Sequence, residues 1–315
     1  MVVTGASAGV GRAAARAFAL RGASVGLLAR GSDGLDAAHA EVGAGIAIPT
    51  DVADADAVER AAEQVEAELG PIDVWVNNAM ATVFSRFADL TADEFRRATE
   101  VTYLGTVHGT MAALQRMLPR NRGTIVQVGS ALAHRSIPLQ AAYCGAKAAV
   151  RGFTDSVRCE LLHERSRVHV TMVQLPALNT PQFELARSRL PRRPRPVPPI
   201  YQPEVAAEAI VWAASRRRRE VFVGGPTLLA IVGNRLAPTL GDLYLARTAY
   251  EAQQTLTPVE PEEPDNLFRP VPGDHGARGP FDDEAKERSL QLWLTRNRGW
   301  LAGGGLALAA LARRR

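Results

Sequence analysis

The chain has 315 residues, of which 46% are hydrophobic and 22% are charged. This length and composition suit one large folded domain with an appendage, and they exclude a chain that is disordered throughout. The formal net charge of +4 comes from arginines along the whole chain, whose clusters lack interleaved aromatic residues, so we expect no nucleic-acid partner. The two cysteines, Cys144 and Cys159, have the spacing of neither a disulfide framework nor a metal site, which favours a reducing cytoplasm and no metal.

The N-terminal residues predict half of a dinucleotide-binding unit. Residues 1–4 are apolar and predict a strand, residues 5–11 form a glycine-rich turn, and residues 12–21 predict an alanine-rich helix. Glycines in such a turn let the backbone approach a pyrophosphate, and the helix N-terminus offers it free N–H groups. A glycine-rich turn can also be no more than a turn, so this turn alone leaves the question open.

Apolar segments then alternate with segments of helical length. The predicted strands are 23–29, 45–50, 72–76, 124–128, 168–175 and 220–223, and the last helix before 220 is predicted over 203–215. This alternation implies a parallel sheet covered by helices on both faces. Arg30 ends the second strand, near where the adenine ribose lies in such folds, and a cation there favours a cofactor with a 2′-phosphate.

The segment from Ser130 to Lys147 carries groups suited to proton transfer. Tyr143 and Lys147 are four residues apart and share one face of a helix, where an ammonium beneath a phenol favours the phenolate. Ser130 lies where a predicted strand ends, and its hydroxyl could hold a carbonyl oxygen beside the phenol. The Tyr-x-x-x-Lys spacing also occurs by chance on many helices. Lys147, however, is one of only two lysines in an arginine-rich chain, and arginine could not relay a proton.

Together these motifs resemble the short-chain dehydrogenase/reductase family over roughly residues 1–225. The motifs that carry the resemblance are Thr4-Gly5-x-x-x-Gly9-x-Gly11, Asp51, Asn77-Asn78-Ala79, Ser130 and Tyr143-x-x-x-Lys147. The resemblance implies a doubly wound, Rossmann-like α/β fold and an NADP(H)-dependent oxidoreductase. Such an enzyme would interconvert a small-molecule carbonyl compound and an alcohol, with Tyr143 as general acid or base, and we also expect a homo-oligomer.

The resemblance further implies a role for each matching residue. Ser130, Tyr143 and Lys147 would be catalytic, and Lys147 would also bind the nicotinamide ribose. The cofactor-binding residues would be Gly5, Ser7, Gly9, Val10, Gly11, Arg30, Asp51, Val52, Asn77, Ala79, Tyr143, Lys147, Pro176 and Thr180. Asp51 and Val52 would contact the adenine, while Asn77 and Ala79 would steady the sheet and the cofactor. Taken alone, Asp51 would be a helix N-cap and the asparagines would be turn residues.

Three positions depart from the family pattern. Met80 replaces the usual glycine after Asn-Asn-Ala, and Ala177 replaces the usual glycine after Pro176. Thr102 stands where the family commonly has an asparagine that holds a relay water. Its hydroxyl could still hold a water, so Thr102 stays a catalytic candidate, but we expect its helix to lack the usual distortion. These departures keep open a second class of function, a cofactor-binding scaffold or sensor with little turnover. The intact Ser130, Tyr143 and Lys147 favour the enzyme.

The domain organisation follows from composition. A catalytic domain over 1–225 would include a semi-rigid, proline- and arginine-rich lid over 178–203, although a solvated loop is the alternative. Residues 226–256 predict two short helices, and 257–280 predict an extended arm. The tail over 281–315 returns to helical spacing and ends in an apolar segment between arginines, too short to span a bilayer. That segment could lie on a membrane surface, dock on a partner or stay disordered.

Overall fold

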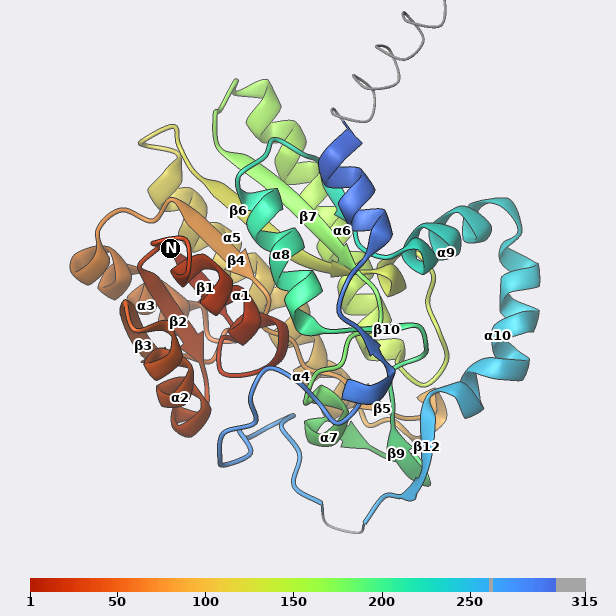
Figure 1. Cartoon of the computed structure of the whole chain (residues 1–315). Helices are drawn as coiled ribbons and strands as arrows, with labels where there is room; N and C mark the ends of the chain where they lie inside the picture. Colours follow the sequence, from red (N-terminus) through yellow and green to blue (C-terminus); the bar gives the residue numbers. More distant parts are fainter. Residues whose placement is uncertain (261–262, 299–315) are drawn as a thin grey trace, which may run out of the picture.

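Seven parallel strands form the central sheet of the computed structural model, which describes residues 1–260 and 263–298. The strand order is β11-β7-β6-β4-β1-β2-β3, and helices cover both faces of the sheet (Figure 1). In chain order the strands are β1 (Val2–Thr4), β2 (Val25–Ala29), β3 (Gly45–Pro49), β4 (Val74–Asn77), β6 (Thr124–Ser130), β7 (His169–Leu175) and β11 (Glu220–Phe222). The order changes direction between β1 and β4, which is where ligands bind in open α/β sheets. The predicted doubly wound α/β fold is confirmed.

The two faces of the sheet have separate hydrophobic cores, because successive residues of each strand point to opposite sides. Val2 and Val3, both fully buried, belong to different cores. One core holds side chains from α1 (Gly9–Ala19), α2 (Ser32–Val42) and α8 (Pro203–Ala214). The opposite core holds side chains from α3 (Ala55–Leu69), α4 (Ala92–Thr99), α5 (Gly105–Met117) and α6 (Ala141–His163). Burial on both faces explains why the strands are continuous apolar runs.

A π-helical turn over Glu100–Leu104 joins α4 to α5, so the expectation of an undistorted helix at Thr102 is wrong. The hydroxyl of Thr102 donates to the carbonyl oxygen of Ala81 and accepts the Ala81 N–H, both at 2.9 Å. The hydroxyl of Thr106 donates to the Thr102 carbonyl oxygen at 2.9 Å. A π-helical turn interrupts the regular hydrogen-bond pattern of a helix, and here the Thr106 hydroxyl supplies a hydrogen bond to the Thr102 carbonyl oxygen.

Residues 178–203 are anchored by strand pairing at three places, so they do not form a solvated loop. The segment contains α7 (Gln182–Leu185), β8 (Arg187–Ser188), β9 (Arg192–Pro194) and β10 (Ile200–Tyr201). Its partner strands are β5 (Val83–Phe84) for β8, β12 (Gln254–Pro258) for β9 and β13 (Ala285–Lys286) for β10.

The C-terminal third begins with the two predicted helices, α9 (Gly225–Leu236) and α10 (Pro238–Ala252), which extend from one side of the sheet (Figure 1). After β12, residues 263–281, which we call the arm, run without regular secondary structure towards α1 and α2. Within the predicted helical segment 281–298, only residues 290–298 are an α-helix. The helical prediction fails over 282–288, where a short 3-10 turn (Asp282–Glu284) precedes β13, because pairing with β10 overrides the local pattern.

The predicted membrane-active segment, residues 299–312, lies outside the described residues. Within residues 1–260 and 263–298, no helix is long and apolar enough to cross a membrane.

Candidate active site

An elongated cleft runs along the carboxyl ends of the strands, where β1 and β4 diverge. Its adenosine end, as we call it, is lined by the glycine-rich turn, and its catalytic end is lined by Ser130, Tyr143 and Lys147. The two ends share five lining residues, namely Val10, Asn78, Met80, Thr180 and Gln182. A single extended ligand could therefore contact both ends.

Main-chain contacts hold the glycine-rich turn against the end of β4. The hydroxyl of Thr4 accepts the N–H groups of Asn78 and Ala79 at 2.9 and 3.0 Å. Gly5 has a φ of +66°, and a Cβ there would lie 2.8 Å from the Ala79 Cα. A Cβ on Gly11 would lie 2.1 Å from the Gly5 carbonyl oxygen. Gly5, Ser7, Gly9 and Val10 line the cleft, whereas Gly11 lies behind Gly5 and makes this close approach possible.

Tyr143 and Lys147 share one face of α6 and line the catalytic end, as the four-residue spacing predicted. The Lys147 ammonium lies 5.7 Å from the centroid of the Tyr143 ring and donates a 2.6 Å hydrogen bond to the Val128 carbonyl oxygen. Burial lowers the pKa of Lys147 to about 8. Ser130 ends β6, is 7% exposed, and accepts the N–H of Leu132 at 3.1 Å through its hydroxyl.

The sequence led us to expect that Lys147 would favour the phenolate form of Tyr143, whereas the burial of Tyr143 favours the phenol. Burial raises the pKa of Tyr143 to about 12, and a hydrogen bond with Ser130 offsets only part of that rise. The Lys147 ammonium does not reverse the rise, because it bonds to Val128 rather than to the phenol oxygen. Tyr143 therefore stays a phenol at neutral pH, a form that donates a proton rather than accepting one.

Besides Gly11, two predicted site residues lie outside the cleft, namely Asn77 and Thr102. Asn77 donates to Gln127 at 2.9 Å and accepts the indole N–H of Trp75 at 2.8 Å, so it steadies the sheet, while its neighbour Asn78 lines the cleft. Thr102 is fully buried and lines neither end. Its only hydroxyl proton goes to Ala81, so it has none to pass to a relay water. We therefore correct Thr102 from a catalytic candidate to a residue that supports the main chain.

At the adenosine end, Arg30, Asp51, Val52 and Ala79 line the cleft. Arg30 is already engaged: it donates to the carbonyl oxygen of Leu267 at 3.2 Å and to that of Asn266. Burial and the neighbouring Arg97 lower the pKa of Arg30. The predicted cation is thus present, but carbonyl groups of the arm already bind both of its Nη atoms.

No sequence pattern predicted the arm residues that also line the adenosine end. Asn266, Pro270, Val271, Gly273 and His275 all contribute to this surface. They lie far beyond the motifs in the sequence, and none belongs to a residue pattern that predicts nucleotide binding.

Pro176 and Thr180 lie after β7 and line the catalytic end, and Thr180 lines the adenosine end as well. A Cβ on Gly9 would lie 3.4 Å from the Thr180 Cβ, so this threonine stands directly across from the glycine-rich turn. The lid segment adds Phe183, Arg195 and Val197 to the catalytic end. Phe183 and Val197, together with Leu132 and Ile137, give that end an apolar lining, and Arg195 is a charged member of the same lining.

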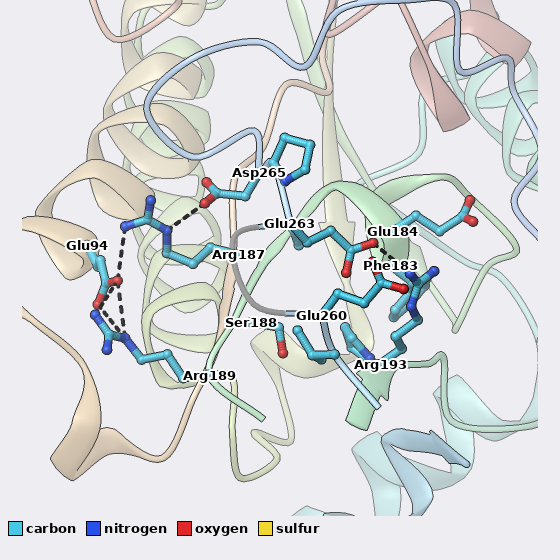
Figure 2. Close-up of a pocket in the computed structure, with 14 residues that line it drawn as sticks. Glu94, Phe183, Glu184, Arg187, Ser188, Arg189, Arg193, Glu260, Glu263 and Asp265 are labelled. Carbon is cyan, nitrogen blue, oxygen red and sulfur yellow. Dashed lines mark hydrogen bonds and ion pairs between the residues drawn. The ribbon is translucent and has the colours of Figure 1, made fainter. Parts of the chain in front are cut away.

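A second, ionic pocket anchors the lid segment. Figure 2 shows Glu94 between Arg187 and Arg189, which donate to its carboxylate at 3.2 and 2.8 Å, and Arg187 also reaches Asp265 of the arm. Burial alone would raise the pKa of Glu94, but hydrogen bonds from Arg189, the Thr91 main chain and Arg187 outweigh it and lower the pKa to about 2. This pocket joins α4, the lid segment and the arm, and neither Tyr143 nor Lys147 lines it.

No group of His, Cys, Asp or Glu side chains that could hold a metal ion occurs in the part of the chain that the structure describes. The close-packed glycines and the free N–H groups at the start of α1 fit a pyrophosphate. The residues present therefore suit a nicotinamide dinucleotide.

This fold, with a glycine-rich turn and a Ser-Tyr-Lys cleft at its switch point, defines a Rossmann-like nucleotide-binding oxidoreductase. The family model described as short chain dehydrogenase matches residues 1–190, and the chain belongs to this family. The resemblance seen in the sequence is confirmed. Members of this family are oxidoreductases that bind NAD(P)(H) cofactors and act on small molecules.

Several relatives match most of the chain. The uncharacterized oxidoreductase YxnA of Bacillus subtilis is 33% identical over 85% of this chain and 77% of its own length. A fatty acyl-CoA reductase of Acinetobacter baylyi is 27% identical over 78% of this chain and 82% of its own length.

Two solved structures are also similar to most of this chain. An alcohol dehydrogenase from the archaeon Thermococcus sibiricus, complexed with 5-hydroxy-NADP, is 27% identical, with a TM-score of 0.60 over 70% of this chain and 94% of that one. A short-chain dehydrogenase from Streptomyces avermitilis is 28% identical, with a TM-score of 0.65 over 77% of this chain and 95% of that one.

Proposed function

We propose that the protein is an NADP(H)-dependent reductase that converts a carbonyl group to an alcohol. The observation that carries this proposal is that Ser130, Tyr143 and Lys147 line one end of a cleft whose other end is lined by the glycine-rich turn. A carbonyl carbon beside Tyr143 would then be within the span of a dinucleotide that lies along the cleft.

Each residue of the catalytic end has a distinct task in this reaction. Ser130 holds the substrate oxygen with its hydroxyl, and Tyr143 donates a proton to that oxygen as the carbonyl carbon is reduced. Lys147 binds the nicotinamide ribose with its ammonium. A bound nicotinamide supplies the hydride. Because the pKa of Tyr143 is raised to about 12, the proton that reduction needs is present at neutral pH.

The lining of the catalytic end supports an apolar substrate. Leu132, Ile137, Phe183 and Val197 surround the space next to Ser130 and Tyr143. The relative named fatty acyl-CoA reductase supports a substrate that carries an alkyl chain. Arg30 at the adenosine end supports NADPH over NADH, because a guanidinium recognises a 2′-phosphate.

A panel of aldehydes and ketones, scored by the loss of NADPH absorbance, tests this proposal. We expect oxidation of NADPH by at least one carbonyl compound with an alkyl chain, and oxidation at least about 10²-fold slower by the Tyr143→Phe variant with the same compound. Tight NADPH binding with no turnover across the panel would instead favour the cofactor-binding scaffold or sensor.

We also propose that the protein attaches peripherally to an anionic membrane. Leu229, Val232 and Leu236 follow helical spacing on α9, and each is at least 50% exposed. Leu240 and Leu243 on α10 are also at least 50% exposed.

The charge of α9 and α10 fits an anionic surface. The acidic residues of α10, Asp242 and Glu251, are paired with Arg135 and Arg192. Arg235 on α9 and Arg247 on α10 therefore supply the remaining charge of the surface, and basic residues beside exposed leucines are typical of interfacial helices.

Co-sedimentation with anionic liposomes checks this attachment. We expect the full chain to bind at low salt and to be released by salt. A chain that ends at Arg298 separates the contribution of the tail from that of α9 and α10, and it keeps β13. Leu236→Asp with Leu240→Asp should weaken binding, whereas Leu20→Asp, at an exposed leucine after α1, is the matched control. If the full chain stays in the supernatant at low salt, the membrane proposal is wrong.

Sedimentation velocity of the same samples would test the homo-oligomer, which stays a prediction.

A further inference from the structure

The arm, residues 263–281, crosses the adenosine end of the cleft and contacts both of its sides. We propose that residues 266–276 of the arm are the outer wall of the cofactor site, so that a bound dinucleotide lies between the arm and the ends of β1 and β2. This inference rests on the proposed function, because it names how the same site holds its cofactor. The family match ends at residue 190, so the shared core of the family does not supply this wall.

The first anchor of the arm lies at the end of β2. Leu267 is fully buried, in the same core as Val52. Its carbonyl oxygen accepts hydrogen bonds from Arg30 and Arg97, each at 3.2 Å. The N–H of Asn266 donates to the Leu185 carbonyl oxygen at 2.8 Å, which ties the same point to the lid segment. A fully buried leucine cannot leave its core without leaving a cavity, so this anchor is firm.

The second anchor lies at the glycine-rich turn. The carbonyl oxygen of Gly276 accepts the N–H of Gly9 at 3.0 Å, and Asp274 pairs with the guanidinium of Arg12, whose side chain is 3% exposed. The N–H of Gly273 donates to the Asp33 carboxylate at 2.7 Å, at the start of α2. This end of the arm is therefore fixed next to the glycine-rich turn, beside the position where the pyrophosphate of a dinucleotide would bind.

Between the two anchors the arm bounds open space rather than filling it. Pro270, Val271 and His275 line the same end of the cleft as Ser7 and Val52. Gly276 occupies only the first N–H of α1, and the next N–H groups of a first helical turn also lack partners within the helix. The arm is thus placed to enclose a ligand and leaves main-chain donors for its phosphates.

The cation Arg30 also lines the space between the arm and the sheet. Arg30 bonds to neutral carbonyl groups of the arm rather than to a carboxylate, so these bonds orient the guanidinium without cancelling its charge. A guanidinium held in this way suits the adenosine 2′-phosphate. The arm therefore contributes to cofactor retention directly, and to recognition of the phosphate by orienting Arg30.

An engineered disulfide between the wall and the sheet tests the enclosure. A Cβ on Gly31 would lie 3.2 Å from the Pro270 Cβ, close to the ~3.5–4.5 Å that disulfides span. Gly31→Cys with Pro270→Cys is made in a Cys159→Ser background, which removes the exposed native thiol. The release of bound NADPH into excess NADP⁺ is then followed by fluorescence, with the reduced form of the same protein as reference.

We expect the oxidised form to release NADPH at least about tenfold more slowly, because the arm must move for the cofactor to leave, and reduction should restore the rate. Equal release rates from the two forms would overturn the inference while leaving the proposed function intact. A reduced protein that binds neither NADPH nor NADH would overturn both.

A second variant does not depend on forming the disulfide. Asp274→Ala removes the contact with Arg12 and leaves the pair between Arg12 and Glu41 in place. We expect NADPH release to quicken by about fivefold or more, since one anchor is lost. Asp283→Ala is the matched control, because Asp283 is an exposed aspartate beyond the arm. Unchanged release, or a lower Kd for NADPH in Asp274→Ala, would overturn the inference, the latter by showing that the arm blocks the site.

Discussion

At the catalytic end of the cleft, Ser130, Tyr143 and Lys147 come from one stretch of chain, whereas the adenosine end is lined by Arg30, which follows β2, and by residues of the arm. The first arrangement needs only a strand, a short loop and a helix. The second needs the folded chain to return to its own N-terminal half. The candidate catalytic groups are therefore placed by local geometry, whereas the proposed wall of the cofactor site is placed by long-range packing.

The two ends also differ in how their cations respond to pH. Lys147 is buried next to the Tyr143 ring, and its pKa is lowered to about 8. Arg30 and Arg12 are guanidinium groups and stay charged at any physiological pH. Changes in pH between 7 and 10 should therefore act on the catalytic end and leave the charge of the adenosine end unchanged.

The largest effect should come from Tyr143→Phe, which keeps the ring and removes the transferable proton. We expect turnover to fall by about 10²–10⁴-fold, because general acid catalysis is lost. NADPH binding, measured by fluorescence titration, should be largely kept, since the adenosine end is untouched. Turnover close to that of the unmutated protein would remove Tyr143 from the mechanism.

A pH profile separates the two ends without mutation. Reduction needs the proton on Tyr143, present up to a pKa of about 12, and the charge on Lys147, lost above a pKa of about 8. We therefore expect kcat/KM for NADPH to be level below pH 8 and to fall by up to about tenfold per pH unit above it. Steady-state rates from pH 6 to 10 at low NADPH measure this, and a profile that stays flat or rises above pH 8 would contradict it.

Arg30→Ala acts on the adenosine end alone. A charge-assisted contact to the 2′-phosphate is worth roughly 1.5–3 kcal/mol, or about 10- to 150-fold in affinity. Because the arm carbonyls already bind both Nη atoms of Arg30, we expect the lower limit, a loss of about tenfold in the preference for NADPH over NADH. Titration of both cofactors measures it, with Arg122→Ala, an arginine that is 76% exposed, as the control. Equal use of NADH and NADPH by the unmutated protein would exclude this role for Arg30.

Glu94→Gln tests the ionic pocket that joins the lid segment to α4 and the arm. We expect the free energy of unfolding to fall by about 1.5–3 kcal/mol at neutral pH, because hydrogen bonds to a charged group are lost. The pKa of Glu94 is lowered from 4.5 to about 2, so its stabilisation is complete above pH 4.5 and is lost as the pH falls through 2. The difference between variant and parent in urea unfolding should shrink over that range. Glu184→Gln, an exposed glutamate of the same pocket, should change little, and an equal loss in both variants would contradict the assignment.

Where the elements lie, and which of them carry the catalytic groups, could be predicted from sequence because these features repeat over short distances. Apolar runs marked β1, β2, β3, β6 and β7, and the spacing of Tyr143 and Lys147 placed both on one helical face. Single-residue assignments were less secure. Asn77 and Asn78 are adjacent and chemically identical. Because β4 ends at Asn77, that side chain bonds within the sheet, whereas Asn78 follows the strand and lines the cleft.

Contacts between distant segments could be decided only by the tertiary structure. The π-turn at Thr102 depends on Ala81, the strand at Ala285–Lys286 depends on β10, and the raised pKa of Tyr143 depends on burial that no local pattern encodes. The arm has no apolar periodicity, yet Leu267 enters the core and Gly276 meets Gly9. Local backbone preferences act within a few residues of each other, whereas burial and pairing arise when the whole chain packs and excludes water.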